Sequence, residues 1–343
     1  MSSTTDILSL SKDTLIARLA VLGEKSYRAT QILDSIFKKY ATSYNDITTL
    51  SKELREQLSS TVPFPILKET DRRTSKDGTI KFLFTLSDGE MIETVFIPTE
   101  KRATLCISSQ AGCKFGCAFC ASGLLGWKRN LTVGEILGQV LYAQHETKGA
   151  VSHIVFMGTG EPFDNYDNVL AAAKMLNAPE GFHIAARHIT ISTCGVVPGI
   201  ERFAGEGMQI ELSVSLHASN DTIRSQLMPV NKKYPLKVLI SACRAYAQKT
   251  NRQVTLEYIL IRDLTCTPMA AKELARLMKG WLSKVNLIPY NVVKELPYLT
   301  PSREDIAGFK MMLERSGVIC TLRAPRGTDI AAACGQLRHS LRK

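Results

Sequence analysis

The sequence has no long apolar run. Hydrophobic residues make up 45% of its 343 positions, yet the longest apolar stretches, such as NLIPYNVV at residues 286–293, fall well short of the ~20 residues that a membrane-spanning helix needs. The start of the chain, MSSTTDILSLSKD, lacks the basic and then apolar order of a secretory signal peptide. We therefore expect a cytoplasmic protein that does not bind a membrane.

Cysteines and acidic residues are also scarce. Nine cysteines are too few and too unevenly spread for a secreted, disulfide-stabilised scaffold. Asp and Glu number 32 against 43 Lys and Arg, which gives a formal net charge of +11. This excess predicts a polyanionic partner. Nucleic acid is favoured over a membrane surface, since no basic amphipathic segment with an aromatic face stands out.

The first part of the chain predicts helices followed by a hairpin, and no internal repeat or low-complexity segment interrupts it. Apolar residues recur at three- and four-residue spacing in residues 11–23 and 26–41, and Ser51 opens a third helical segment. Residues 79–98 are two alternating apolar runs around Asp88-Gly89, the pattern of a β-hairpin. We assign residues 1–98 to an accessory, RNA-binding domain and residues 99–343 to a catalytic domain.

From residue 99 onwards strand and helix patterns alternate. This alternation predicts parallel β/α units that form an open or closed barrel rather than a sandwich. Thr132 with Glu135 predicts a capping box, and Thr300 before Pro301 predicts the N-cap of the last helix. Ligands bind at the C-terminal ends of the strands in such folds. The predicted strands lie at residues 103–109, 152–158, 188–193, 210–218, 254–261, 284–291 and 318–324.

Four of the nine cysteines lie within residues 106–120. Cys113, Cys117 and Cys120 form a C-x3-C-x2-C motif, whereas a structural zinc site usually needs four ligands. A [4Fe-4S] cluster is normally held by four thiolates. Three thiolates would leave one iron open to a substrate. Cys106 lies outside this spacing and needs a separate explanation.

The motif, with Phe119 before its last cysteine and a position after the first parallel strand, resembles the radical S-adenosylmethionine (SAM) superfamily. There, a [4Fe-4S] cluster binds the amino and carboxylate groups of SAM through its open iron and supplies the electron that cleaves it to a 5′-deoxyadenosyl radical. The resemblance implies a partial (β/α)6-type barrel and an electron donor such as flavodoxin or ferredoxin. The implied cluster ligands are Cys113, Cys117 and Cys120.

Polar residues and glycines occupy other predicted strand ends. FMGTGEPFDN places glycines where the backbone can approach a ligand, and Glu161 where a carboxylate can meet an ammonium group. His217 alone could equally be a hydrogen-bonded core histidine, and Asn291 a turn residue. Their shared location at strand ends favours SAM binding. The predicted SAM-binding residues are Gly160, Glu161, Ser192, Ser215, Leu216, His217 and Asn291.

Further motifs resemble one family of RNA methyltransferases. ETVFIP, MGTGEP, ISTCGVVPGI, MPVNKKYP and RGTDIAAACGQL are similar to enzymes that methylate adenine C2 in 23S rRNA and tRNA, and to their relative, the chloramphenicol-florfenicol resistance methyltransferase, which acts at C8. Pro162 after Glu161 matches the C2 enzymes. The resemblance implies a monomeric enzyme that methylates an adenosine of 23S rRNA, with tRNA as a second substrate.

The resemblance also implies a route through protein sulfur. Adenine C2 lies between two ring nitrogens and is too electron-poor to attack the methyl group of SAM. In this route the Cys334 thiolate takes a methyl group, which a radical then activates for addition to C2. Cys106 releases the product by forming a disulfide bond with Cys334, and Glu93 accepts a proton.

Several alternatives stay open. Without the resemblance, Cys334 would be a small buried cysteine and Glu93 a salt-bridge partner. A related enzyme could methylate another adenosine position, such as C8, and an iron-sulfur protein could bind RNA without turnover. We expect RNA contacts from residues 28–40 and from the tail RHSLRK at 338–343. Cys243 and Cys320 are predicted core residues, and Cys194 and Cys266 have no assigned role.

Overall fold

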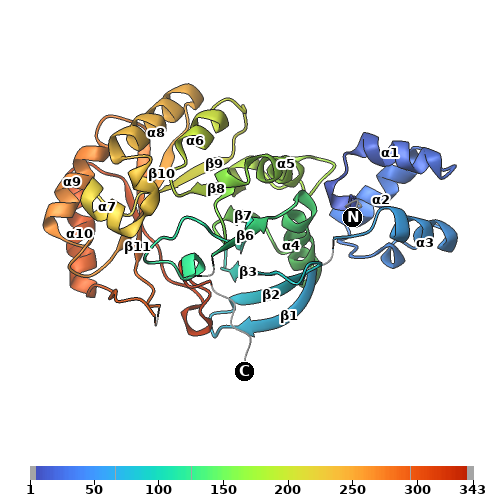
Figure 1. Cartoon of the computed structure of the whole chain (residues 1–343), viewed down its shortest axis with the longest axis horizontal. Coiled ribbons are helices and arrows are strands. Elements are labelled where there is room, and N and C mark those ends of the chain that lie inside the picture. The colour runs from blue at the N-terminus through green and yellow to red at the C-terminus, as the bar shows by residue number, and fades with distance from the viewer. Residues whose placement is uncertain (1–4, 66, 125, 294, 338–343) are drawn as a thin grey trace.

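The structure, a computed structural model, describes residues 5–337 apart from residues 66, 125 and 294. Three N-terminal helices form a lobe at one end of a large curved sheet (Figure 1). The hydroxyls of Ser11 and Ser51 cap the first and third helices. The lobe joins the rest of the protein where Gly134 N donates to Ser9 Oγ at 2.9 Å. Its helices are α1 (Lys12–Val21), α2 (Tyr27–Phe37) and α3 (Lys52–Thr61).

The main body is a ten-stranded sheet in the order β1-β2-β3-β4-β7-β8-β9-β10-β11-β12. Strands β1 to β4 pair antiparallel with one another, and every later neighbour is parallel. Strands β1 and β12 stand at opposite edges, so the curved sheet is an open, partial barrel. The strands are β1 (Leu67–Thr74), β2 (Ile80–Leu86), β3 (Met91–Pro98), β4 (Ala103–Cys106), β7 (His153–Phe156), β8 (Ile189–Thr193), β9 (Glu211–Ser215), β10 (Val254–Leu260), β11 (Ser283–Pro289) and β12 (Cys320–Leu322).

Helices cover the outer face of the parallel strands (Figure 1). Apolar residues of the strands, such as Ile154, Ile191 and Val214, pack in the core. The alternate positions, such as Thr190 and Ser213, line a cavity on the inner face. The barrel interior therefore carries polar side chains beside apolar ones. The helices are α4 (Val133–Glu146), α5 (Tyr166–Asn177), α6 (Val197–Phe203), α7 (Asp221–Leu227), α8 (Leu236–Thr250), α9 (Pro268–Met278) and α10 (Arg303–Arg315).

The structure confirms the predicted fold class, all seven parallel strands, the hairpin around Asp88 and the capping box of Thr132 and Glu135. The predicted N-cap at Thr300 is wrong. Its hydroxyl donates to Tyr290 O, and Ser302 caps α10 instead. The boundary at residue 98 stays a prediction, because β1 to β3 continue the same sheet as the barrel strands.

Two features were not predicted. Strand β1 reads LKETDRRT and has too few apolar residues to show alternation. A separate two-stranded sheet pairs β5 (Gln110–Gly112) with β6 (Trp127–Asn130) on either side of the cysteine motif. Within the described residues, no helix is long and apolar enough to cross a membrane.

A buried guanidinium holds the ends of two barrel strands together. Arg224 of α7 is 0% exposed. Its nitrogens donate to Leu216 O at 3.0 Å, Cys194 O at 2.9 Å and Ser215 O at 3.1 Å, and also to Asn231 Oδ1 at 2.8 Å. These acceptors belong to the segments that follow β8 and β9 and to the turn after α7. One side chain thus fixes the C-terminal edge of the barrel.

We expect Arg224→Met to lower the free energy of unfolding by about 3–5 kcal/mol, because several buried acceptors lose their donors at once. Denaturant unfolding of the purified variant measures this change. Lys237→Met on the exposed surface of α8 is the control and should change stability by less than about 0.5 kcal/mol. A loss no larger than that of the control would contradict the role of Arg224.

Candidate active site

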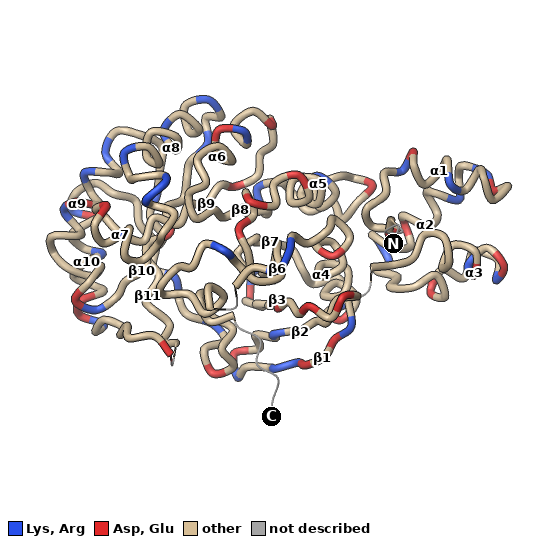
Figure 2. Tube along the Cα trace, viewed as in Figure 1, with Lys and Arg blue, Asp and Glu red and all other residues tan. Residues whose placement is uncertain are grey.

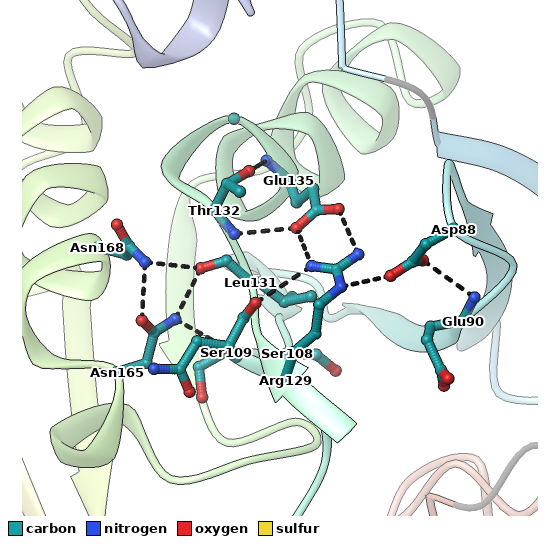
Figure 3. Close-up of polar contacts among 12 residues, drawn as sticks. Asp88, Glu90, Ser108, Ser109, Arg129, Leu131, Thr132, Glu135, Asn165 and Asn168 are labelled. Atoms are coloured by element: carbon teal, nitrogen blue, oxygen red, sulfur yellow. Dashed lines mark hydrogen bonds and ion pairs between the residues drawn. The ribbon is translucent and has the colours of Figure 1, made fainter. Parts of the chain in front are cut away.

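The segment that holds the cysteine motif is pinned at both ends. Asn165 Nδ2 donates to Ser109 O and to Leu131 O, each at 2.8 Å. Asn168 Nδ2 donates to the same Leu131 carbonyl at 3.0 Å (Figure 3). Ser109 precedes the motif and Leu131 follows it. Two asparagines at the start of α5 therefore hold together the two ends of a loop of about twenty residues.

A second set of contacts secures the same loop from the other side. Arg129 of β6 forms ion pairs with Glu135 at 2.8 Å and with Asp88 at 2.5 Å (Figure 3). Glu135 also accepts from Thr132 N at 2.9 Å in the capping box. The β2–β3 turn, β6 and the start of α4 are thus joined by one guanidinium.

The three motif cysteines line a cavity of about 160 Å³ at the C-terminal ends of the barrel strands. Burial raises the pKa of Cys113 to about 11 and that of Cys117 well above its usual value. In the described residues, no three His, Cys, Asp or Glu side chains converge on a single metal-ion position. Thiolates of an iron-sulfur cluster bind different iron atoms, so they need not converge in this way.

The surroundings of the cavity fit an iron-sulfur cluster. Three free thiols of one short loop face it. Thiols are the donors that iron-sulfur clusters take, and the apolar side chains of Phe119 and Tyr290 pack with Cys117 and Cys120.

The glycines of the MGTGEP motif have a packing role in addition to the predicted approach of a ligand, which stays a prediction. A Cβ on Gly158 would lie 2.7 Å from the backbone of Ile107, and a Cβ on Gly160 would lie 2.6 Å from Gln110 Cβ. Both glycines line the smaller cavity, but the chain that approaches them is the protein's own. They allow the end of β7 to pack against the segment that leads into the cysteine motif.

Glu161 is buried, and its two carboxylate oxygens accept from different backbone groups. Cys194 N donates at 2.6 Å and Phe163 N at 2.9 Å. Burial nevertheless raises the pKa of the carboxyl group. Glu161 lines the cavity, so its remaining lone pairs can face a ligand cation there. It also ties the end of β7 to the end of β8.

His217 is both a hydrogen-bonded interior histidine and a cavity residue. Its Nδ1 accepts from Ile259 N at 3.2 Å, and its ring meets Phe119 edge-on with centroids 4.7 Å apart. Burial, and secondarily Arg224, lowers its pKa to about 3, so the ring is neutral at pH 7. Its backbone has φ of +58°, a strained conformation that the surrounding contacts must maintain.

The other predicted SAM-binding residues separate into two groups. Ser192 and Ser215 line the smaller cavity. Leu216 does not, because its side chain is fully buried in the main core. Asn291 lines a second, larger cavity, and its Nδ2 donates to Cys334 O at 3.2 Å. The structure thus connects Asn291 with the C-terminal cysteine.

The larger cavity, of about 800 Å³, occupies the interior of the barrel. Cys106 and Cys334 both line it, although they are 228 positions apart in the sequence. Burial and then the proximity of Cys334 raise the pKa of the Cys106 thiol to about 12. Five residues line both cavities and mark where they meet: Met157, Glu257, Ile288, Arg323 and Cys334.

Two charged residues at this junction were not predicted. Glu257 accepts from Ser213 Oγ at 3.0 Å and from Asn286 Nδ2 at 2.8 Å, and burial raises its pKa. Arg323 contacts Met157 Sδ at 3.7 Å, and the charges of Cys334 and then Glu257 raise its pKa. A glutamate inside the apolar strand VTLEYIL was the available signal for Glu257.

Glu93 lies on β3 and is 2% exposed. Lys81 Nζ of β2 is 2.9 Å from Glu93 Oε1. The same ammonium donates to Ala331 O at 3.0 Å, three residues before Cys334. The salt-bridge alternative for Glu93 is therefore observed, and it connects this carboxylate with the C-terminal segment.

All nine cysteines are free thiols in the structure, so the disulfide between Cys106 and Cys334 is absent here. Cys243 is fully buried in the core, and Cys320 is partly buried against it. Cys194 packs near Cys117 and donates its backbone N–H to Glu161. Cys266 is partly buried against the core.

Comparisons with known proteins identify the family. Residues 107–268 match the radical SAM superfamily, and residues 5–63 match the ribosomal RNA large subunit methyltransferase N-terminal domain. A radical SAM methyltransferase from Sphaerobacter thermophilus superposes with a TM-score of 0.95 at 44% identity, covering 97% of this chain and 99% of that one. The fold and site are therefore those of a radical SAM enzyme.

Curated relatives show to which family of radical SAM enzymes the chain belongs. Proteins named "probable dual-specificity RNA methyltransferase RlmN" are 47% identical in Geobacillus kaustophilus, over 98% of this chain and 93% of that protein, and 49% identical in Bacillus pumilus, over 93% and 90%. The chain belongs to the RlmN family of radical SAM RNA methyltransferases. This confirms the resemblance seen in the sequence, and membership implies an iron-sulfur cluster and SAM.

We expect Cys117→Ala to lose most of its iron and its visible absorption after anaerobic purification, because the loop offers no replacement thiolate in its place. Iron and sulfide analysis measures the loss. Cys243→Ala is the matched control, since it removes a buried core thiol and should keep its iron. Zinc in place of iron in the unaltered protein would contradict the cluster assignment.

Proposed function

We propose that the protein methylates C2 of an adenosine in 23S rRNA and in tRNA, through a methyl group held on Cys334. The observation that supports this proposal best is the position of Cys334 at the junction of the two cavities. One cavity contains the three motif cysteines, and the other contains Cys106. A carrier thiol must meet both SAM and the RNA base, and among the cysteines of the described residues Cys334 is the one that lines both cavities.

We assign Cys113, Cys117 and Cys120 as cluster ligands. The strand-end residues around the smaller cavity, together with Asn291 beside Cys334, would bind SAM. The cluster supplies one electron for cleavage of SAM. Glu161 can face the ammonium group, and neutral His217 can donate from Nε2 without adding a positive charge beside the sulfonium. These assignments follow from the lining of the cavity and from family membership.

The Cys334 thiolate first displaces the methyl group of one SAM molecule, with the bonding electron pair passing to the departing sulfur. Arg323 is the cation that lines the same junction. After the activated methyl carbon has joined C2, Glu93 accepts the C2 proton. One electron must leave the ring together with this proton, to a one-electron acceptor of the flavodoxin or ferredoxin class. The Cys106 thiolate then attacks the Cys334 sulfur and a disulfide bond forms. The electron pair of the broken S–C bond passes to the carbon, which takes up a proton and becomes the methyl group of the product. A thiol reductant must restore both cysteines.

The larger cavity suits a nucleotide. Its volume of about 800 Å³ is within the usual range for small-molecule sites. Five Lys or Arg residues line it against two Glu residues, and such an excess attracts phosphate. These cations are Arg102, Arg187, Lys284, Arg323 and Arg326. The surrounding RNA would therefore lie against the rim of this cavity.

The charge of the N-terminal lobe supports RNA binding less strongly than the charge of the larger cavity does. Eight Lys and Arg residues are interspersed with seven Asp and Glu residues in residues 1–63 (Figure 2). We keep residues 1–98 as an RNA-binding domain, with contacts from exposed cations such as Lys39. The tail 338–343 lies outside the described residues. The proposal further includes a flavodoxin or ferredoxin as electron donor, a monomeric enzyme and a cytoplasmic location.

A C8 methyltransferase is the second candidate, and Pro162 after Glu161 favours C2 over it. A cluster protein that binds RNA without turnover is the third. Mass spectrometry of nucleosides from RNA treated with the reduced enzyme and SAM distinguishes the three. 2-Methyladenosine supports the proposal, 8-methyladenosine indicates the second candidate, and unmodified RNA with no SAM cleavage indicates the third.

We expect Cys106→Ala to keep its cluster and methylate Cys334, yet to accumulate a covalent protein–RNA adduct, because the thiol that should release the product is missing. Denaturing gel electrophoresis detects the adduct, and nuclease treatment should return free protein. The adduct should be absent in Cys106→Ala/Cys334→Ala. Normal turnover by Cys106→Ala, or an adduct in the double variant, would refute this mechanism.

RNA affinity should fall steeply as salt rises, because Lys and Arg release counterions from phosphates. We expect Arg187→Ala and Lys39→Ala each to reduce the slope of log K against log salt by roughly 0.7–0.9. Fluorescence anisotropy with an RNA stem-loop at several salt concentrations measures it. Lys237→Ala on α8 is the control. An unchanged slope in Arg187→Ala would show that the rim of the larger cavity does not contact RNA. An unchanged slope in Lys39→Ala would show the same for the N-terminal lobe.

A further inference from the structure

A buried lysine connects two parts of the proposed reaction centre. Lys81 is 6% exposed on β2. The strand register places Lys81 opposite Val95 and Leu83 opposite Glu93, so Lys81 and Glu93 are diagonal neighbours on one face of the sheet. Their ion pair spans 2.9 Å. Two charges are rarely buried together unless each satisfies the other.

The turn between β1 and β2 holds the segment that leads to Cys334. We call residues 75–79 the docking turn. Ser75 Oγ donates to Asp329 Oδ1 at 2.6 Å, and Lys76 N donates to Asp329 Oδ2 at 3.3 Å. Gly327 N donates to Asp77 Oδ2 at 3.1 Å. Three hydrogen bonds therefore join parts of the chain that are about 250 residues apart.

Close packing reinforces this attachment. Gly327 has φ of +60°, and a Cβ there would lie 2.9 Å from Thr79 Cγ2. On the other side of Cys334, Ala121 N donates to Gly335 O at 2.7 Å, and Ser122 Oγ donates to Leu337 O at 2.7 Å. We call residues 110–130 the cysteine loop. The segment that carries Cys334 is thus held on one side by the docking turn and on the other by the cysteine loop.

Lys81 also contacts the segment that carries Cys334. Its ammonium donates to Ala331 O at 3.0 Å while it pairs with Glu93. No other Lys or Arg ion pair among the described residues has both side chains under 10% exposed. The ion pair between Lys81 and Glu93 therefore lies inside the barrel and is not part of a surface charge network.

We propose that Lys81 is a positioning residue that holds the Glu93 carboxylate in its proton-accepting orientation beside the Cys334 segment. The inference rests on the proposed function, in which Glu93 accepts the proton from adenine C2. In that step the C2–H bond breaks, the proton moves to the carboxylate, the electron pair of the bond stays on the purine ring, and the unpaired electron left by radical addition passes to a one-electron acceptor of the flavodoxin or ferredoxin class. A buried carboxylate that loses its cation tends to bind a proton, and a protonated Glu93 could not accept another.

The test compares Lys81→Met and Lys81→Arg with the unaltered enzyme, and uses Lys68→Met, an exposed lysine of β1, as the matched control. Three quantities are measured separately: iron content, methylation of Cys334, and 2-methyladenosine formed. We expect Lys81→Met to keep its iron and to methylate Cys334 within about threefold, because the docking turn and the cysteine loop still hold the segment. Product formation should fall by roughly 10²-fold, the usual effect of losing a general base, while the protein–RNA adduct accumulates.

Rescue and a double variant separate positioning from mere stability. Lys81→Arg keeps a cation and should recover much of the product. Lys81→Met/Glu93→Gln should be no slower than Glu93→Gln alone, since both changes affect the same step. Normal turnover by Lys81→Met, additive losses in the double variant, or loss of Cys334 methylation in parallel with the product would overturn the proposal. Absence of 2-methyladenosine with the unaltered enzyme would instead refute the proposed function.

Discussion

The architecture of the site depends on the buried guanidinium of Arg224. It binds the carbonyl of Cys194, whose N–H in turn binds the carboxylate of Glu161. Glu161 N binds Gln110 Oε1, and Gln110 Nε2 binds Asn130 Oδ1. One continuous set of hydrogen bonds therefore runs from the end of β9 to the cysteine loop. Strand ends that each have their own backbone conformation are thus fixed relative to one another by side chains.

The interior of the barrel departs from the usual rule that alternate strand faces become apolar core. Its inner positions include Thr, Ser, Asn, Glu and Lys residues beside apolar ones such as Val155 and Ile288, and together they line two cavities. A protein that gives up this much apolar packing must compensate elsewhere, and the helix-covered outer face provides the continuous core. Cys334 lies where the cavities meet, so one side chain can take part in chemistry on both sides without a large movement of either ligand.

The sequence predicted what depends on local pattern. Period-two and helical spacing located the barrel strands and helices, and cysteine spacing located the cluster loop. It could not predict Lys81 or Arg323, because their significance comes from partners distant along the chain. Strand β1 was missed because its residues are nearly all polar. The packing role of the glycines in MGTGEP could not be predicted, since only the folded chain shows that Ile107 and Gln110 fill the space beside them.

The attachment of the C-terminal segment to the docking turn has a consequence for biosynthesis. Ser75 and Asp329 are 254 positions apart, and a ribosome that adds 5–20 residues per second needs about 12–50 s to synthesise that interval. The docking turn therefore leaves the ribosome long before its partner exists. Strand β12 ends 12 residues before Cys334, so the last barrel strand and the Cys334 segment are synthesised almost together. The hydrogen bonds of the docking turn to Asp329 and Gly327 are thus among the last contacts that the folding chain can form.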